Sequence, residues 1–179
     1  MRLFTAITFD EDMKNYIMEA SDKLRLQAEG GSFTLRENLH LTLNFIGETK
    51  RLELAKEAMT KAVEKKSLGS FSITVGGFGR FKRREGDICY IRVEKEPLLW
   101  KLQKELVAEL KIAGFEVDDL EYKPHLTLAR RARLSAGFDE KLYGANIPGK
   151  SMEVKRISLM NSERIRGILT YTEIYGIDL

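Results

Sequence analysis

The chain contains one tetrapeptide twice, as His40-Leu41-Thr42-Leu43 and as His125-Leu126-Thr127-Leu128. These copies hold both histidines of the 179-residue chain and lie 85 residues apart, from position 40 to position 125. Given the first copy, a second histidine followed by the same three residues would arise by chance about once in a thousand sequences of this composition. The repeat therefore predicts two equivalent places in the fold, each with one histidine.

Side-chain alternation gives this tetrapeptide a chemical use. On a β-strand, residues i and i+2 share one face, so each histidine stands beside its threonine while the two leucines point to the opposite face. The leucine face can pack under a helix, and the polar face can line a cleft. Two copies related by a pseudo-twofold axis would present two imidazoles and two hydroxyls to the same place.

Strand-like and helix-like segments surround both copies in a similar order. In the first part of the chain they are a strand at 2–9, a helix capped by Asp10, a strand at 39–45, a helix at about 51–65 and a strand at 71–75. In the second part they are a strand at 87–93, a helix from Pro97 to Gly114, a strand at about 124–130, a short helix at 135–142 and strands at about 152–160 and 165–177. β-Branched and aromatic residues mark the strands, and apolar residues at helical spacing mark the helices.

The two series share one offset, because the strands that begin at 2 and 39 recur 85 residues later at 87 and 124. This offset predicts an internal duplication, with copies that span approximately 1–84 and 85–179. We therefore expect a single α+β domain over residues 1–179, built as two pseudo-symmetric lobes around a central cleft.

Two histidines in a cleft suit displacement at a phosphodiester. The reaction needs a base on the entering oxygen and an acid on the leaving oxygen, and histidine serves in either role because its unperturbed pKa is about 6.5. Threonine hydroxyls can donate hydrogen bonds to the non-bridging oxygens. A metal site is a weaker interpretation, since Asp118, Asp119 and Glu121 show no recognisable ligand spacing. A cysteine or serine nucleophile lacks support, because Cys89 has no neighbouring histidine and no Gly-x-Ser-x-Gly turn occurs.

Charge and cysteine content indicate which partners and which cellular compartment to expect. Net charge is only +3, but basic residues gather in two clusters that can attract phosphate or form solvated loops. The clusters are Arg80, Lys82, Arg83 and Arg84, and Lys123, Arg130, Arg131 and Arg133. Cys89 is the single cysteine, which excludes an internal disulfide and fits a buried strand position in a reducing cytoplasm. No signal peptide or membrane-spanning apolar run is visible, so we expect a cytoplasmic protein with no membrane partner.

Two blocks around the histidines, Glu37–Gly47 and Pro124–Arg130, resemble the paired His-x-Thr-x motifs of the two-histidine (2H) phosphoesterase superfamily. The opening strand Arg2–Ile7 is similar to that of the family, and the tail resembles its closing hairpin at Leu159, Ser162, Gly167 and Tyr171. Within the superfamily, the chain looks like the bacterial and archaeal RNA 2′,3′-cyclic phosphodiesterases, historically called 2′-5′ RNA ligases. It departs at Lys82, where the family often has proline, and at Tyr90, where it often has tryptophan.

The resemblance implies lobes made of mainly antiparallel sheets with outer helices, and hydrolysis of terminal 2′,3′-cyclic phosphates to 2′-phosphomonoesters. His40 would be the proton donor to the leaving 3′ oxygen, and His125 the proton acceptor that activates water. Thr42 and Thr127 would bind the phosphate, and Arg130 would stabilise its charge. Strict alternation places Arg130 on the leucine face, so it reaches the phosphate only if the strand bends or ends there.

The expected partners are RNA ends or nucleoside 2′,3′-cyclic phosphates, bound by a monomer without metal or organic cofactor. Two alternatives remain open. One is reversible 2′-5′ RNA ligation or cleavage at the same site. The other is a non-catalytic binder of 2′-phosphorylated or 2′-5′-linked RNA. An intact histidine in each motif favours an enzyme, because binding alone does not require two titratable groups.

Overall fold

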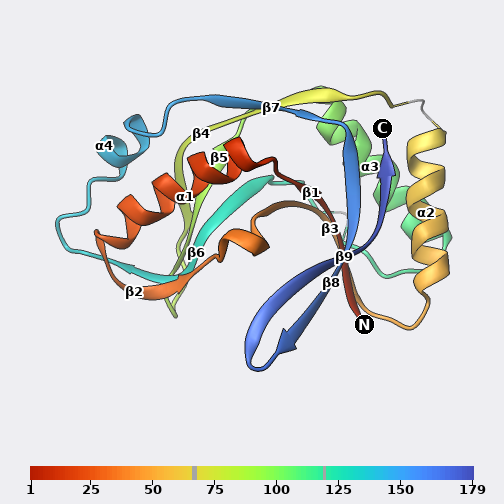
Figure 1. Cartoon of the computed structure of the whole chain (residues 1–179), viewed down its shortest axis with the longest axis horizontal. Helices are drawn as coiled ribbons and strands as arrows, with labels where there is room; N and C mark the ends of the chain where they lie inside the picture. The colour runs from red at the N-terminus through yellow and green to blue at the C-terminus, as the bar shows by residue number, and fades with distance from the viewer. Residues whose placement is uncertain (66–67, 119) are drawn as a thin grey trace.

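A computed structural model describes residues 1–65, 68–118 and 120–179 and shows an α+β fold with two antiparallel sheets (Figure 1). In chain order the elements are β1 (Arg2–Thr8), α1 (Glu11–Arg25), β2 (Ala28–Phe33), the 3₁₀ turn η1 (Arg36–Asn38), β3 (His40–Glu48), α2 (Leu52–Glu64), β4 (Phe71–Phe81), β5 (Asp87–Val93), α3 (Pro97–Ile112), β6 (His125–Leu134), α4 (Glu140–Ala145), β7 (Lys150–Val154), β8 (Arg156–Ile165) and β9 (Ile168–Asp178). The two-lobed α+β prediction is confirmed.

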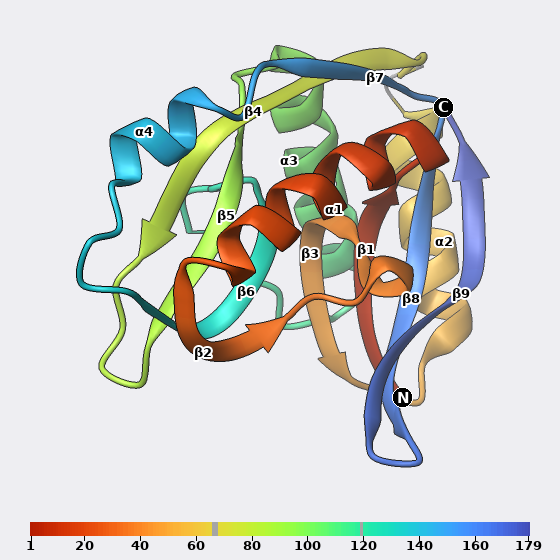
Figure 2. The same cartoon turned by 60° about the vertical axis from the view of Figure 1, so that its left-hand side comes forward.

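The two sheets have corresponding strand orders. One sheet runs β3-β1-β8-β9 and the other β2-β6-β5-β4-β7, so each motif strand pairs with the opening strand of its series. Helices α1 and α4 contact the five-stranded sheet, whereas α2 and α3 pack on each other beside the four-stranded sheet (Figures 1 and 2). The polar faces of the motif strands are thereby left free to line the space between the lobes.

Neither sheet is built from one half of the chain. Strands β4 and β8 start 85 residues apart, at Phe71 and Arg156, yet β4 pairs with β5 and β8 pairs with β1. The predicted boundary between residues 84 and 85 therefore does not separate the lobes. The physical reason is local: β4 and β5 are joined by the short loop 82–86, so they pair as a hairpin, and the boundary falls inside its turn. The internal duplication itself stays a prediction.

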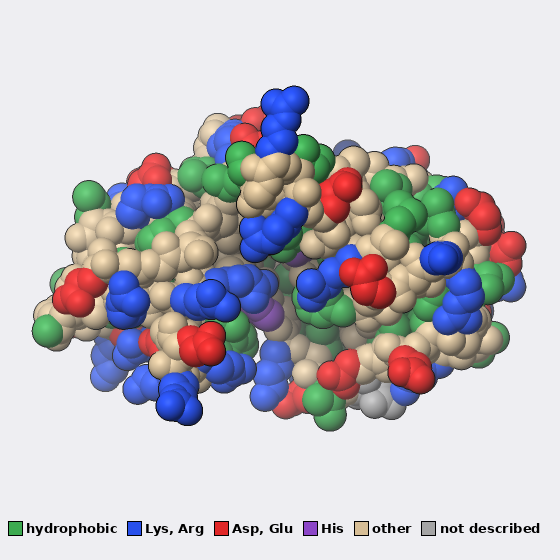
Figure 3. Space-filling view, turned by 90° about the horizontal axis from the view of Figure 1, so that it is seen from below, with side chains coloured by type: hydrophobic (Ala, Val, Ile, Leu, Met, Phe, Trp, Pro, Cys, Tyr) green, Lys and Arg blue, Asp and Glu red, His purple; other side chains and the backbone are tan. Residues whose placement is uncertain are grey.

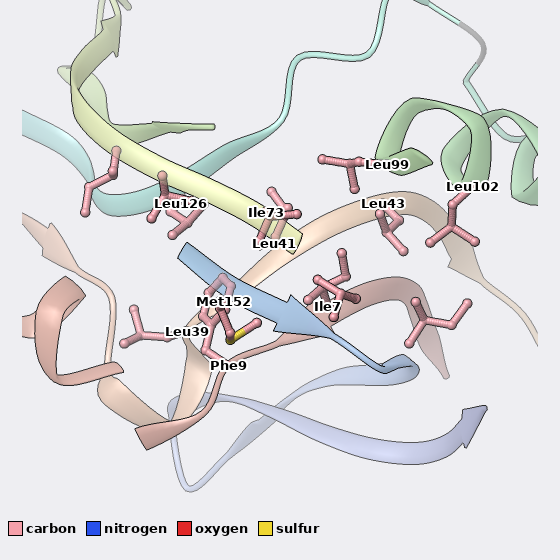
Figure 4. Packing of buried hydrophobic residues seen from close by; sticks show 14 of the residues in the cluster. Ile7, Phe9, Leu39, Leu41, Leu43, Ile73, Leu99, Leu102, Leu126 and Met152 are labelled. Carbon is pink, nitrogen blue, oxygen red and sulfur yellow. The ribbon is translucent and has the colours of Figure 1, made fainter. Parts of the chain in front are cut away.

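The leucines of both motifs lie in the core, as alternation predicts. Leu41, Leu43, Leu126 and Leu128 are all buried. Leu43 lies near Leu99 and Leu102 of α3 in Figure 4. Complete burial of a leucine side chain contributes roughly 1.5–3 kcal/mol, so this face fixes which side of each motif strand points into the cleft.

Several local signals are confirmed, and others were missed. The Asp10 carboxylate accepts a hydrogen bond from the Met13 amide at 2.7 Å and caps α1, and Pro97 is in the first turn of α3. The short helix predicted at 135–142 lies instead at Glu140–Ala145, because Asp139 provides the cap. The edge strand β2 was not predicted, and the single strand predicted at about 152–160 covers parts of both β7 and β8. Strand β2 has the sequence Ala-Glu-Gly-Gly-Ser-Phe, which lacks apolar alternation.

Two further observations concern the single cysteine and the question of membrane-spanning helices. Cys89 lies buried on β5, and burial raises the pKa of its thiol to about 12. Among the residues that the structure describes, no helix has the length and apolar character needed to cross a membrane.

Candidate active site

Each motif strand begins at its histidine, and both imidazoles have the same backbone anchor. The Nδ1 of His40 lies 2.7 Å from the carbonyl oxygen of Asn38, and the Nδ1 of His125 lies 2.7 Å from that of Lys123. A carbonyl oxygen only accepts hydrogen bonds, so Nδ1 carries the proton in both rings. The Nε2 atom is therefore the one left for proton transfer. The Thr42 hydroxyl lies 3.0 Å from the Nε2 of His40.

The two motifs meet in the hollow between the lobes (Figure 3). A cavity of about 310 Å³ is lined by His40 together with Arg130 of the other motif strand. A neighbouring cavity of about 180 Å³ is lined by Thr42 of the first motif and His125 of the second. Residues from positions far apart in the sequence thus share one cleft. Thr127 is half-buried beside His125, but its side chain lines neither cavity.

A register shift decides where Arg130 points. In the pairing of β5 with β6, Tyr90 faces Thr127 and Cys89 faces Ala129, so Leu128 has no partner. The extra residue makes Leu128 and Ala129 both buried and returns Arg130 to the exposed side. The side of the strand that strict alternation predicted for Arg130 was therefore wrong. The irregularity in β6 that would let Arg130 reach the phosphate is present at Leu128.

The same shift occurs in the first motif strand. Ala6 faces Thr42 and Thr5 faces Asn44, which leaves Leu43 without a partner. Phe45, the counterpart of Arg130, is consequently exposed. In both motif strands, a one-residue register shift thus places the fifth residue after the histidine outside the core.

Aromatic rings flank both histidines. The ring centroids of Phe4 and Tyr171 each lie 5.0 Å from that of His40. Those of Phe81 and Tyr90 lie 5.2 and 5.4 Å from that of His125. These contacts restrict the orientation of each imidazole. Sequence reasoning gave these aromatic residues no role, because they lie on β1, β4, β5 and β9 and no local pattern connects them with the motifs.

Asn38 is a second residue that sequence reasoning missed. Its side-chain amide donates to the carbonyl of Leu169 at 2.8 Å and accepts from the amide of Tyr171 at 3.1 Å. Its own carbonyl holds His40. Asn38 is buried, and it therefore fixes both the imidazole and the strand that supplies Tyr171. Its position inside the motif block was the one available signal.

Tyr122 ties the two motifs together from the side of His125. Its hydroxyl donates to the backbone carbonyl of Thr42 at 2.9 Å. Burial raises the pKa of this phenol, so the hydroxyl keeps its proton and remains a donor at neutral pH. The segment before the second motif thereby holds the backbone of the first.

The electrostatic setting favours neutral histidines in the free protein. Burial lowers the pKa of His40, the hydrogen bond to the Asn38 carbonyl opposes this, and the positive charge of Arg130 lowers it further. Burial and Arg130 also lower the pKa of His125. A cleft that disfavours added positive charge is one that an anion stabilises, because an anion cancels the charge of Arg130.

The fold places the residues of the two predicted basic clusters in different surroundings, some paired with acidic residues and some exposed in a loop. The guanidinium of Arg80 bonds to Glu140 at 2.9 Å and to Asp87 at 3.1 Å, so it is occupied within the protein. Lys82, Arg83 and Arg84 are exposed in the loop between β4 and β5. Of the second cluster, Lys123 lies 3.3 Å from Glu121 and Arg131 lies 3.6 Å from Glu85. Of both clusters, only Arg130 lines the cavity beside His40.

Carboxylates near the cleft do not form a metal-binding group in the part of the chain that the structure describes. No three or more His, Cys, Asp or Glu side chains there lie close enough to bind one ion. Asp118 and Glu121 line the cavity beside His125, and Asp119 lies outside the described residues.

Comparison with known proteins places this cleft in a family. The model of the 2′-5′ RNA ligase superfamily matches residues 16–166. An RNA 2′,3′-cyclic phosphodiesterase of Thermotoga maritima is 31% identical over 90% of this chain and 87% of its own length. One from Methanothermobacter thermautotrophicus is 28% identical over 97% and 96%. The crystal structure of E. coli LigT complexed with 3′-AMP superposes with a TM-score of 0.80 and 25% identity, over 99% of this chain and 97% of LigT. With its paired histidine motifs in one cleft, the chain belongs to the 2′-5′ RNA ligase superfamily.

Proposed function

We propose that this protein hydrolyses RNA-terminal 2′,3′-cyclic phosphates to 2′-phosphomonoesters. The observation that carries the proposal is the matched anchoring of the two imidazoles, which leaves both Nε2 atoms for proton transfer in a cleft shared with Arg130. The relatives named as RNA 2′,3′-cyclic phosphodiesterases support the substrate class. The LigT complex with 3′-AMP supports binding of a nucleotide in a cleft of this fold.

The reaction is an in-line displacement at phosphorus. The Nε2 of His125 accepts a proton from water while the water oxygen bonds to phosphorus. The bond between phosphorus and the 3′ oxygen breaks, and the Nε2 of His40 donates a proton to that oxygen. The product keeps its phosphate on the 2′ oxygen, and one water has been consumed. Each positioned acid or base typically contributes about 10²–10⁴-fold in rate.

Arg130 and the two threonines act on the phosphate itself. Charge gathers on its non-bridging oxygens in the transition state, where the Arg130 guanidinium and the hydroxyls of Thr42 and Thr127 stabilise it. The phosphate anion also offsets the positive charge that lowers both histidine pKa values. Substrate binding thus favours the state in which one imidazole is protonated, as the acid requires.

The assignment of His40 as donor and His125 as acceptor rests on the family resemblance. Near-symmetric anchoring would let either ring do either task. One chain supplies both motifs, so a monomer is sufficient for activity. We also place the protein in a reducing cytoplasm, where the buried Cys89 thiol stays unmodified.

Ligation is the second candidate. The matching family is described as 2′-5′ RNA ligases, and a 5′-hydroxyl could replace water beside His125 to form a 2′-5′ linkage. A purely binding role is less well supported, because binding alone does not require two titratable groups, each with its Nε2 atom left for proton transfer.

The decisive experiment incubates the protein with adenosine 2′,3′-cyclic phosphate in excess EDTA and identifies the product by phosphorus NMR. We expect the 2′-monophosphate, formed at the same rate with and without chelator. A 3′-monophosphate would contradict the assigned leaving oxygen. Activity that vanishes with EDTA and returns with a divalent ion would contradict the metal-independent mechanism.

A further inference from the structure

Asn44 directly follows the first motif and is a buried polar residue. Only 5% of its surface is exposed. Its Oδ1 atom is buried and has no hydrogen-bond partner among the residues that the structure describes. A buried acceptor without a partner destabilises a folded protein, so a group of this kind beside a reactive cleft points to a molecule that binds it.

The backbone of Asn44 is fixed at the wall of the cavity beside His125. Its amide donates to the hydroxyl of Thr5 at 3.1 Å, and Thr5 is fully buried. The register shift in β3 leaves Leu43 and Asn44 both buried. Asn44 and His125 belong to different sheets and line the same cavity of about 180 Å³. Water takes about 30 Å³ in the liquid, so it fits here.

Other polar groups on this wall have partners or more freedom. The two carboxylates bind their own neighbours, Asp118 the backbone amide of Leu120 at 2.9 Å and Glu121 the ammonium of Lys123 at 3.3 Å. The Thr42 hydroxyl lies 3.0 Å from the Nε2 of His40. Gln103 is a longer side chain, half-buried on α3. Among the described residues of this wall, Asn44 is therefore the buried amide whose oxygen is left for a bound molecule.

The second motif carries alanine at the equivalent position. Ala129 is the fourth residue after its histidine, as Asn44 is, and it is completely buried and lines neither cavity. The amide is thus found at one histidine cavity, that of His125. This difference matches the proposed reaction, in which the nucleophile enters beside His125 and His40 acts on the leaving oxygen.

We propose that Asn44 orients the attacking water beside His125 and thereby favours hydrolysis over transfer to an alcohol. The inference rests on the proposed function, because that function assigns the entering oxygen to His125. As the water oxygen bonds to phosphorus, one hydrogen passes to the Nε2 of His125. The other is donated to the amide oxygen of Asn44 and stays on the product. Rotation of the planar amide about its last side-chain bond turns that oxygen to the cavity.

The chemistry of the nucleophile explains why an amide is suited to this task. A neutral amide accepts a hydrogen bond but does not compete with the imidazole for the proton. An alcohol, including an RNA 5′-hydroxyl, has a single hydrogen, which His125 takes. It therefore donates nothing to Asn44 while it attacks. Asn44 gives water the advantage of one hydrogen bond and so separates hydrolysis from ligation.

The test measures two products formed in a mixture of water and methanol. Adenosine 2′,3′-cyclic phosphate gives the 2′-monophosphate with water and the methyl ester of that phosphate with methanol, and phosphorus NMR separates them. Asn44→Leu keeps a similar volume but removes the amide. It should slow formation of the monophosphate about 10-fold and change formation of the ester less than about twofold. The ratio of ester to monophosphate should therefore rise about 10-fold.

Three further variants make the result specific. Asn44→Ala should shift the ratio in the same direction and replaces the leucine variant if that one does not fold. Asn44→Asp keeps an oxygen acceptor and should leave the ratio near that of the wild type. Asn161→Leu is the matched control, because Asn161 is another buried asparagine whose Oδ1 lacks a partner among the described residues, yet it lines neither histidine cavity. Its ratio should be that of the wild type.

Several results would overturn the proposal. Equal slowing of both products by Asn44→Leu would show that Asn44 acts on packing or on the phosphate, and unchanged rates would remove its role. A shifted ratio in Gln103→Leu but not in Asn44→Leu would assign the water to Gln103. A wild type that forms neither product would refute the proposed function and this inference with it. An active wild type with an unchanged ratio in the Asn44 variants would refute the role of Asn44 alone.

Discussion

His40 and His125 share a backbone anchor but have different surroundings. The residue whose carbonyl holds His40 is Asn38, a buried residue whose side chain also binds β9. The residue whose carbonyl holds His125 is Lys123, whose side chain points to solvent and pairs with Glu121. The shared anchor gives both rings the same tautomer. The shared anchor cannot distinguish a proton donor from an acceptor, so if the two rings have different roles, the residues around them must set the difference.

Replacing either histidine is the most severe way to test this comparison. His40→Ala and His125→Ala should each lower kcat by about 10²–10⁴-fold, because each removes a positioned proton donor or acceptor. The double variant should lose much less than the product of the single losses, since both groups act on one displacement. Single-turnover rates with a nucleoside 2′,3′-cyclic phosphate measure both effects.

A substrate with a better leaving group at the 3′ position separates the two roles. It needs little help from an acid, so it should largely restore the rate of His40→Ala and not that of His125→Ala. Rescue of His125→Ala alone would reverse the assignment. Near-wild-type activity of either single variant would refute the two-histidine mechanism.

Arg130 and Phe45 are the second pair of equivalent positions. Arg130→Ala should lower kcat/KM by about 10²–10³-fold, because a cation is lost where negative charge develops. It should also raise the pKa of both histidines, since Arg130 lowers both. NMR titration of the imidazoles measures this shift. Arg131→Ala is the neighbouring control, an exposed arginine beside Glu85 that should change neither quantity.

Alanine substitutions at Asn38 and Lys123 test how much the side chain of each anchoring residue contributes to stability. Asn38→Ala keeps the carbonyl that holds His40 but removes two hydrogen bonds to β9, so it should lower the free energy of unfolding by about 1–3 kcal/mol. Lys123→Ala keeps the other carbonyl and should change stability little, because its ion pair is exposed. Denaturant unfolding measures both. Equal stability of the two variants would show that Asn38 does not fix β9.

The smallest expected effect is on the pH dependence of stability. Both histidine pKa values are lowered in the folded state, so the unfolded chain binds more protons below about pH 6.5. The free energy of unfolding should therefore fall as the pH decreases from 6.5 toward the folded pKa values. Unfolding curves at pH 7.5 and 5.5 should differ less for the double His→Gln variant than for the wild type. An unchanged difference would place the effect on other groups.

The sequence correctly predicted features that depend only on residues close together in the chain. Alternation within His-Leu-Thr-Leu predicted that Leu41 and Leu126 are buried, and the Asp10 cap predicted the start of α1. The position of Arg130 could not be predicted in this way, because it depends on how β6 pairs with β5 at Leu128. The role of Asn38 depends on a strand near the far end of the chain. Such pairings are properties of the assembled sheets.

The pairing of β8 with β1 has a consequence for how the protein is made. Ala6 pairs with Ser158. One edge of the opening strand β1 therefore has no hydrogen-bonded partner until β8, far along the chain, has been synthesised. Tyr171, which packs on His40, emerges from the ribosome later still. The first lobe is therefore completed only after β8 and β9 have been synthesised, and a chain truncated before β8 contains both histidines but lacks a wall of the cleft.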